Sequence, residues 1–204
     1  MLIDHLIYAD PDLDSAVATV HRHFGVEATG GGQHPGRGTH NKLLALGPRT
    51  YLELVAPDPR QPDPATRRPY GVEGVTRGGL VGWAIAVDDI DAARTNARLH
   101  GFDPGHVVDG HREDATGRLL HWRATANAEL AGVIPFLINW GDTPHPAGGA
   151  PSGLVLRSLR IEHPEPSSVT SALDALGVEV DVVRAPVPAL VARITGPFGE
   201  SELR

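Results

Sequence analysis

The stretch HLIYADPDLDSAVATVHRHFGV, from His5 to Val26, decides the fold because related stretches occur twice more in the chain. GWAIAVDDIDAARTNARLHGF runs from Gly82 to Phe102, and a weaker copy, RIEHPEPSSVTSALDALGV, runs from Arg160 to Val178. Each copy has an apolar run, a cap rich in Pro, Asp or Glu, and an amphipathic segment that ends near a glycine. A repeated supersecondary unit sets the architecture of a chain, so we predict a duplicated strand–helix unit.

The local patterns around the first copy predict what the unit contains. Ile3, His5 and Ile7 fall at the period of two that is typical of a strand. Apolar residues then follow at helical spacing up to Phe24, and Gly25 is a suitable helix stop. Further strands are predicted after the first two helices, at 41–46, 50–56, 118–125 and 134–140.

The sequence therefore predicts an α+β protein built from βαβββ modules. Two such modules can pair their sheets into one cupped, mixed sheet, whose concave side is the natural ligand site. A third, partial βαββ module is expected at the C-terminus, followed by a polar, mobile tail at 196–204 without predicted strands. The predicted ranges are 1–57, 80–142 and 153–196 for the three modules, with linkers at 58–79 and 143–152.

Composition narrows the class of protein. The 204 residues include no cysteine, which excludes disulfides and zinc–thiolate sites. A net charge of −7 without a run of Lys or Arg makes nucleic acid an unexpected partner. No apolar run approaches the roughly 20 residues of a membrane span, and the first residues lack a signal-peptide pattern. We expect a cytoplasmic protein whose partner is a small molecule, and a homodimer is compatible with the sequence.

Two polar residues lie in otherwise apolar strands. His5 shares a strand face with Ile3 and Ile7, so it is either a ligand in the cup or a buried histidine with a structural hydrogen bond. Glu53 lies within YLELVAP, and burying its carboxylate is unfavourable unless it is paired, protonated or metal-bound. The alternative for Glu53 is an edge strand that faces water.

Longer segments of the first two modules resemble a known family. IDHLIYADPDLDSAV and GGGQHPGRGTHNKLLALGPRTYLELVAPDP, supported by GWAIAVDDIDAA, GRLLHWRAT and IPFLINWGD, resemble the glyoxalase-like branch of the vicinal oxygen chelate superfamily over residues 2–142. The resemblance implies a cupped sheet that holds a divalent metal, with ligands from the first and last strand of each module.

The ligand positions carry over only in the first module. There the resemblance assigns His5 and Glu53 as metal ligands. In the second module the corresponding positions are Gly82 and a residue near Leu137, which offer no side-chain donor. We hypothesise that His40 completes a set of two histidines and a carboxylate, suited to Zn, Mn, Fe or Ni.

The remaining candidate residues concern the substrate. We predict that His34, Asn41, Trp122 and Trp140 contact it, although the tryptophans equally suit a core. Trp83, next to Gly82, is expected to pack away from the cup. The glycine-rich stretch 30–38 favours a flexible loop, and the resemblance suggests that it covers the cup as a lid.

The resemblance implies a metal-assisted enzyme of lyase, isomerase or dioxygenase type that acts on a small oxygenated substrate. Glu53 would then be a catalytic residue, as a ligand or as the base. A metal-free acid–base mechanism would use Glu53 with His5. The alternative is a non-catalytic protein that binds or sequesters a small molecule, which the loss of the second module's ligands favours.

Overall fold

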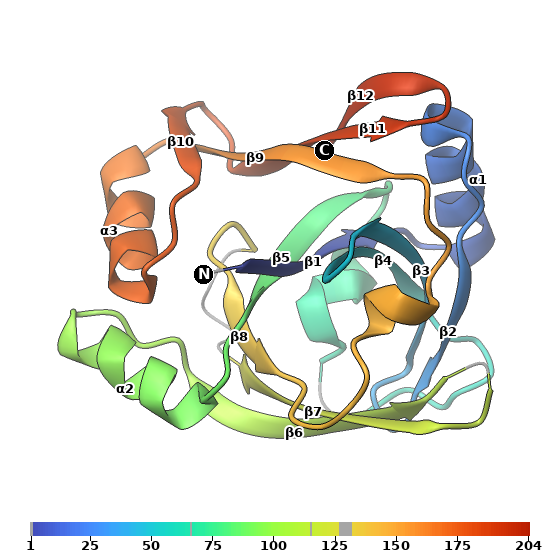
Figure 1. Cartoon of the computed structure of the whole chain (residues 1–204), viewed down its shortest axis with the longest axis horizontal. Helices are drawn as coiled ribbons and strands as arrows, with labels where there is room; N and C mark the ends of the chain where they lie inside the picture. Colours follow the sequence, from blue (N-terminus) through green and yellow to red (C-terminus); the bar gives the residue numbers. More distant parts are fainter. Residues whose placement is uncertain (1, 66, 115, 127–131) are drawn as a thin grey trace.

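The computed structural model describes residues 2–65, 67–114, 116–126 and 132–204, which form one eight-stranded and one four-stranded sheet (Figure 1). The first 57 residues contain β1 (Leu2–Ala9), α1 (Leu13–Phe24), β2 (Thr29–His34), β3 (Thr39–Gly47) and β4 (Thr50–Pro57). A short 3-10 helix, η1 (Pro69–Gly74), precedes β5 (Gly79–Ala86), α2 (Ile90–Leu99), β6 (His106–Glu113), β7 (Leu119–Ala126) and β8 (Phe136–Asn139). After η2 (Pro146–Gly149) come β9 (Val155–His163), α3 (Pro166–Leu176), β10 (Asp181–Arg184), β11 (Ala189–Gly196) and β12 (Gly199–Leu203).

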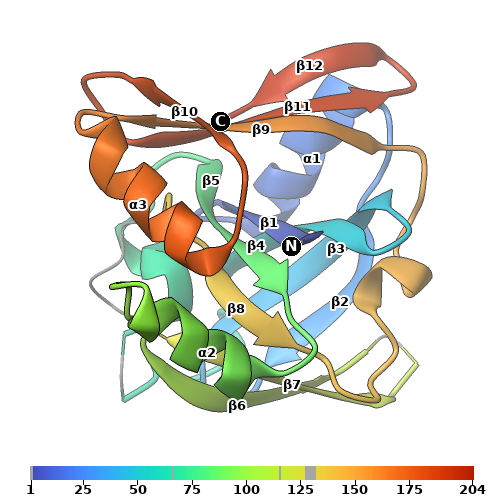
Figure 2. The same ribbon diagram turned by 60° about the vertical axis from the view of Figure 1, so that its left-hand side comes forward.

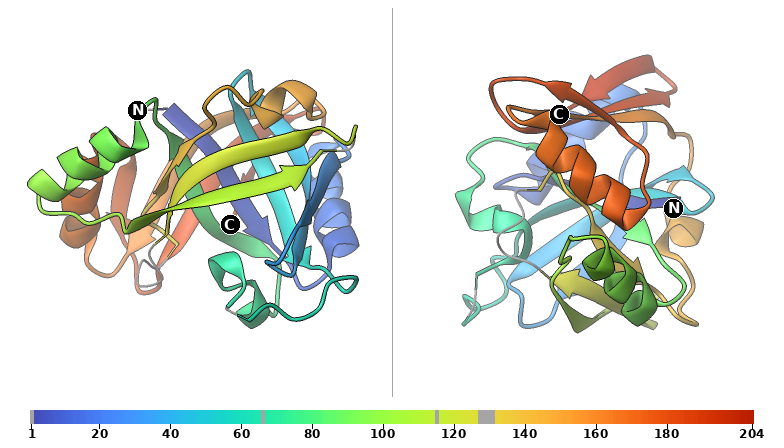
Figure 3. Two further views of the ribbon diagram at one scale, coloured as in Figure 1. Left: turned by 90° about the horizontal axis from the view of Figure 1, so that it is seen from below. Right: turned by 90° about the vertical axis from the view of Figure 1, so that its left-hand side faces the viewer.

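The large sheet is two copies of one module joined along their first strands. Its order is β2-β3-β4-β1-β5-β8-β7-β6. In each copy the first strand lies parallel to the last, β1 to β4 and β5 to β8, while β1 and β5 are antiparallel neighbours. The sheet curls until the edges β2 and β6 lie beside each other (Figure 3). The predicted α+β fold with paired βαβββ modules in a cupped sheet is therefore confirmed.

Glycines make this closure possible, and here the predicted flexible lid was wrong. Thr29–His34 is a strand paired with β3, and the glycines within it allow two close approaches. A Cβ on Gly31 would lie 2.1 Å from the Asn41 carbonyl oxygen, and a Cβ on Gly32 would lie 2.5 Å from the Glu113 carbonyl oxygen. Because Gly31 and Gly32 have no side chain, the β2 backbone can lie close to both β3 and β6.

The C-terminal region forms its own sheet in the order β10-β9-β11-β12. Here the first strand lies parallel to the strand that follows the helix, β10, and antiparallel to β11. In the first two modules its parallel partner is instead the last strand. The prediction of a mobile tail without strands was wrong, since Gly199–Leu203 pairs with β11 as β12.

The main core lies on the convex side of the large sheet. Alternate residues of β1, β4, β5 and β8 point outward to meet α1 and the second sheet, which lies across the top of the molecule (Figure 2). Trp83 belongs to this core, as predicted, and donates its indole N–H to the Val133 carbonyl at 2.8 Å. Asp12 caps α1 through the Ser15 amide, and Gly25 ends it in the left-handed conformation. The concave face of the eight-stranded sheet forms the inside of the cup.

Substituting Gly31 with alanine tests the closure of the sheet. Gly31→Ala places a Cβ against the β3 backbone at a positive φ, so we expect the free energy of unfolding to fall by about 2 to 4 kcal/mol. Gly30→Ala is the matched control, because Gly30 also has a positive φ but open space around it, and should lose only about 1 kcal/mol. Denaturant titration measures both, and equal losses would contradict the close approach.

Candidate active site

The polar residues of the first module converge on the inner face of the cup. On β4, Glu53 faces inward and is 4% exposed, and on β1 His5 faces inward and is 2% exposed. The His5 Nε2 atom lies 3.8 Å from the Glu53 Oε2 atom. The His5 ring stacks on Tyr51 at 4.6 Å, which fixes the plane of the imidazole.

One oxygen of Glu53 is held by Asn41, and His34 in turn holds Asn41. The Asn41 Nδ2 group donates to Glu53 Oε1 at 2.7 Å and to His34 Nε2 at 3.1 Å, while its Oδ1 accepts from the Gly32 amide. Because an amide nitrogen can only donate, His34 Nε2 must be the acceptor and His34 Nδ1 carries the proton, which bonds to Thr39 Oγ1 at 2.8 Å. Both ring nitrogens of His34 are therefore occupied by protein partners.

His34 is a neutral positioning residue in this geometry. Burial lowers its pKa to about 4, and the Arg112 charge acts in the same direction, whereas the Glu53 charge opposes them. A neutral ring with a filled lone pair neither ligates a metal nor serves as a base. Its role is to orient Asn41 and, through it, the carboxylate of Glu53.

A β-bulge brings Asp4 to the same site. Ile3 and His5 pair with consecutive residues of β5, so Asp4 has no partner there, and the extra residue turns its side chain to the side of His5. Asp4 is fully buried, and its Oδ1 atom lies 2.7 Å from His5 Nδ1. A carboxylate with this partner fixes the His5 tautomer, in which Nδ1 donates and Nε2 faces Glu53.

Asp4 is further held by two side chains from the end of the second module. Trp140 Nε1 donates to Asp4 Oδ2 at 3.1 Å, and His145 Nε2 donates to the same oxygen at 3.1 Å. Burial opposes ionisation, but the hydrogen bonds from His145 and His5 prevail and lower the pKa of Asp4 to about 2. Asp4 is thus a stable anion that orients His5.

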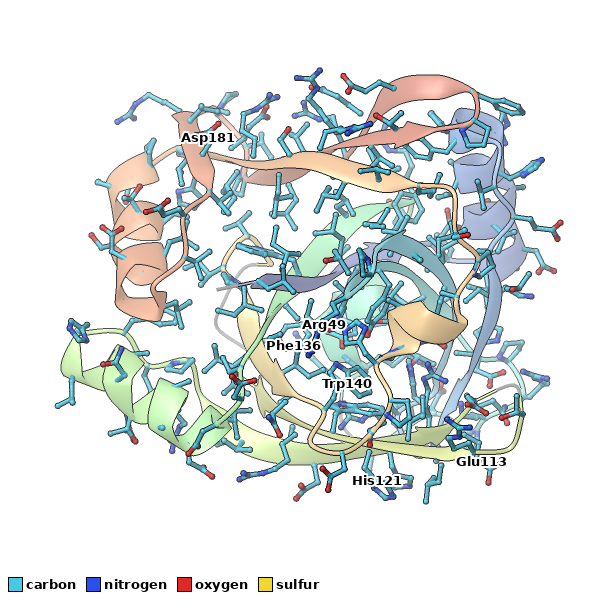
Figure 4. All side chains as sticks on the ribbon, in the orientation of Figure 1. Arg49, Glu113, His121, Phe136, Trp140 and Asp181 are labelled. Atoms are coloured by element: carbon cyan, nitrogen blue, oxygen red, sulfur yellow. The ribbon has the colours of Figure 1, made fainter. Side chains whose placement is uncertain are left out.

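The opposite wall of the cup is apolar. Ala84 and Phe136 are register partners on β5 and β8, as Ile7 and Glu53 are on β1 and β4. Phe136 therefore occupies the place that corresponds to Glu53. Leu137, named by the sequence alignment, faces the convex core instead, because neighbouring strand residues point to opposite faces. The Phe136 ring meets the edge of His5 at 5.5 Å, and Figure 4 shows it within the curve of the sheet.

Two tyrosines complete the surroundings of Glu53. Tyr70, on η1, stacks on Phe136 at 5.9 Å and has a left-handed backbone with φ 61°. Burial raises its pKa and that of Tyr51, and the Glu53 charge adds to both effects. Both phenols stay protonated at neutral pH. A bulky residue held at positive φ is strained. This backbone conformation places the Tyr70 ring against Phe136.

The donor atoms do not complete a metal site. His5 Nε2 and Glu53 Oε2 are available, but His34 Nε2 is filled by Asn41, and Gly82 and Phe136 supply no donor. Within the described parts of the chain, no three His, Asp or Glu side chains form a metal-binding group. His40 is not brought to the cluster, because it points to the other face of β3 from Asn41. Burial lowers its pKa there, and the charge of Asp58 opposes this effect.

The two predicted substrate-binding tryptophans lie at the end of the cup where β8 ends. Trp122 and Trp140 are 5.4 Å apart between ring centroids, and both line an open groove of about 460 Å³. Trp140 also holds Asp4, so it connects the groove to the polar cluster. His121, on the same strand as Trp122, lies on the outer side of the sheet (Figure 4).

The comparisons with known proteins agree with this architecture. A family model described as a glyoxalase-like domain matches residues 3–177. The chain belongs to this family. The vicinal oxygen chelate resemblance in the sequence is thereby confirmed. No curated protein matches the chain.

Several solved structures are similar to the chain at low sequence identity. A hypothetical protein from Staphylococcus aureus is 15% identical with a TM-score of 0.65, over 92% of this chain and 87% of that one. Methylmalonyl-CoA epimerase from Mycobacterium tuberculosis is 21% identical with a TM-score of 0.47, over 72% of this chain and 91% of that one. The Streptomyces coelicolor epimerase, solved with 2-nitronate-propionyl-CoA, is 20% identical with a TM-score of 0.48, over 70% of this chain and 96% of that one.

No helix of the described residues is long and apolar enough to cross a membrane.

Sequence reasoning missed five residues of the site: Asp4, Tyr51, Tyr70, Arg112 and His145. Asp4 is the neighbour of a residue assigned to the cup, so strict alternation would have placed it outside. Tyr51 had a usable signal, because it lies two residues before Glu53 and therefore on the same face. For Tyr70, Arg112 and His145, no pattern in the neighbouring sequence indicates that they lie at the cup.

The state of His34 predicts a pH dependence of stability. The unfolded chain protonates His34 near pH 6.5, whereas the folded protein keeps it neutral down to about pH 4. Folding therefore becomes less favourable as the pH falls through this window, by about 3 kcal/mol at its end. We expect His34→Gln to remove this loss relative to the wild type, while the exposed control His106→Gln keeps it. Urea unfolding at pH 7 and pH 4 measures the difference. An equal loss of unfolding free energy in all three proteins would contradict this prediction.

Proposed function

We propose that the protein is an enzyme in which Glu53 accepts a proton from a small oxygenated substrate held in the cup. The state of the Glu53 carboxylate carries this proposal. It is buried, its Oε1 atom accepts a hydrogen bond from Asn41, and its Oε2 atom lies 3.8 Å from His5 Nε2. A carboxylate held in this way can take a proton from a positioned carbon or oxygen acid.

The neighbouring groups suit the other half of such a reaction. When a proton leaves a carbon next to a carbonyl group, negative charge develops on the carbonyl oxygen. Donors placed in advance stabilise that charge. Tyr51 lies on the same strand face as Glu53, and Tyr70 stacks on Phe136. Both retain their protons at neutral pH, so they are the donors that we assign to this oxygen. His5, oriented by Asp4, is the group that exchanges the proton with Glu53.

This chemistry belongs to the isomerase and lyase classes expected from the resemblance. The metal-assisted form of it would need donors beyond His5 and Glu53. Gly82 and Phe136 have no atom that can ligate a metal through a side chain, and His40 lies on the other face of β3. Dioxygenase chemistry would in addition need a redox-active metal, so the proton-transfer classes are favoured. The Asp4–His5–Glu53 arrangement works as an acid–base system by itself.

Binding without catalysis is the second candidate function. Its support is the apolar character of the second module's wall, where Phe136 stands at the place of Glu53 and packs in one cluster with Ile138. Such a wall holds a ligand by burial of its apolar surface. The two candidates differ in one respect, which is whether a bound molecule exchanges a proton with solvent.

Hydrogen–deuterium exchange tests the enzyme proposal. We expect the wild type to catalyse exchange at the carbon next to the carbonyl group of small 2-oxo acids or hydroxyketones in D₂O, followed by NMR. Glu53→Gln keeps the shape and the bond to Asn41 but removes the base, so the exchange rate should fall about a hundred-fold or more. Glu113→Gln, outside the cup, is the control. A substrate that binds but exchanges equally in the wild type and Glu53→Gln supports the binding protein instead.

Metal analysis tests the conclusion about donors. We expect protein purified without a histidine tag to contain metal well below one ion per chain, and its exchange activity to survive chelation. Stoichiometric metal in the wild type, lost in both His5→Ala and Glu53→Ala, would contradict this expectation and restore the metal-assisted mechanism.

A further inference from the structure

Arg112 is a buried cation that the acid–base mechanism does not use. It lies near the end of β6, is 3% exposed and pairs in register with Leu120 of β7. Alternation along β6 turns Arg112 and Gly110 to the inner face and Asp109 and His111 to the solvent. A Cβ on Gly32 would lie 3.8 Å from Arg112 Nη1, and the Gly32 amide bonds to Asn41, so the guanidinium lies at the β2–β6 side of the cup, beside the residue that holds Glu53.

The protein does not neutralise this cation. The one hydrogen bond that Arg112 makes to the described residues goes from its Nη1 group to the Glu113 carbonyl at 3.2 Å. None of the described carboxylates, Glu53 included, lies within the 4.0 Å that defines an ion pair with Arg112. Asp4 is already saturated by His5, Trp140 and His145. Buried arginines are normally paired with a carboxylate. None of the described buried side-chain nitrogens is sealed without a partner, so the remaining N–H groups of Arg112 face solvent-accessible space.

We propose that Arg112 binds the carboxylate group of the substrate, so that the ligand of the cup is a small carboxylic acid in its anionic form. The planar fork of a guanidinium matches a carboxylate through two parallel hydrogen bonds. One buried guanidinium compensates one negative charge, which suits a carboxylate better than a phosphate dianion. The carboxylate sits at Arg112 and leaves the rest of the molecule beside Glu53. The inference extends the proposed function by naming the substrate class, and it rests on that function for the use of the same cup.

A route to Arg112 starts at the groove beside the tryptophans. Gly110 and Trp122 line this groove, and the Trp122 ring lies over Gly110, where a Cβ would come within 2.3 Å of it. Gly110 is two residues before Arg112 on the same face of β6. The groove therefore reaches the inner face of β6 two residues from Arg112.

The test measures binding rather than turnover. Acetate, pyruvate and succinate are titrated by NMR against Glu53→Gln, in which the proposed catalysis is removed, and against the wild type. The neutral amides of the same acids are the ligand controls. We expect saturable binding of at least one carboxylate that its amide does not reproduce, weakening as salt rises. Binding in Glu53→Gln without exchange activity separates this inference from the proposed function.

The variants distinguish recognition from a structural role. Arg112→Leu should weaken carboxylate binding at least about ten-fold, while its stability equals or exceeds that of the wild type, because an unpaired buried charge is replaced by an apolar side chain. Arg112→Lys keeps the charge without the fork and should lose several-fold in affinity. The control Arg118→Gln, on the exposed turn of the same hairpin, should bind as the wild type does.

Three outcomes overturn the inference. The first is that no carboxylate binds saturably to the folded wild type. The second is that the amides bind as well as the acids. The third is that Arg112→Leu keeps its affinity, or loses its stability together with its affinity, since either result makes Arg112 a structural residue.

Discussion

The antiparallel pairing of β1 with β5 is the contact on which both the cup and its polar cluster depend. It joins the two modules into one sheet, and each strand lies parallel to the last strand of its own module on the other side. The bulge at Asp4 interrupts this same pairing. One extra residue in this pairing turns two successive side chains, Asp4 and His5, to one side, and so creates a hydrogen-bonded Asp–His pair in the buried part of the strand.

The fold was predictable from the sequence because it depends on patterns that survive in a single chain. The repeated strand–helix unit and the glycines after its helices indicated the two modules. The failures came where long-range pairing overrides local pattern. Thr29–His34 has few side chains to show a period of two. It is a strand because β3 pairs with it and β6 packs against it. β6 carries charged residues on its outer face, so it showed no apolar run.

The site was predictable in part. His5, Glu53, Asn41 and His34 do come together, whereas the choice of His40 beside Asn41 was inconsistent with the geometry of a strand. Neighbouring residues point to opposite faces, so only one of His40 and Asn41 can share the cup with Glu53. The register of Leu43 with Glu53 selects Asn41. Arg112 could not be predicted, because the β2 backbone that its guanidinium lies near, at Gly32, is far from it in the sequence.

The duplication explains why the two walls of the cup differ. Corresponding positions carry His5 and Glu53 in one module and Gly82 and Phe136 in the other. Charged groups of opposite sign then lie on the inner face of the sheet, Glu53 on β4 and Arg112 on β6, and Phe136 and Trp122 belong to an apolar cluster of the second module. A symmetric metal centre would hold its ligand from both modules equally. This arrangement instead gives a ligand a direction, with its anionic end at Arg112, its acidic proton at Glu53 and its apolar surface against the second module.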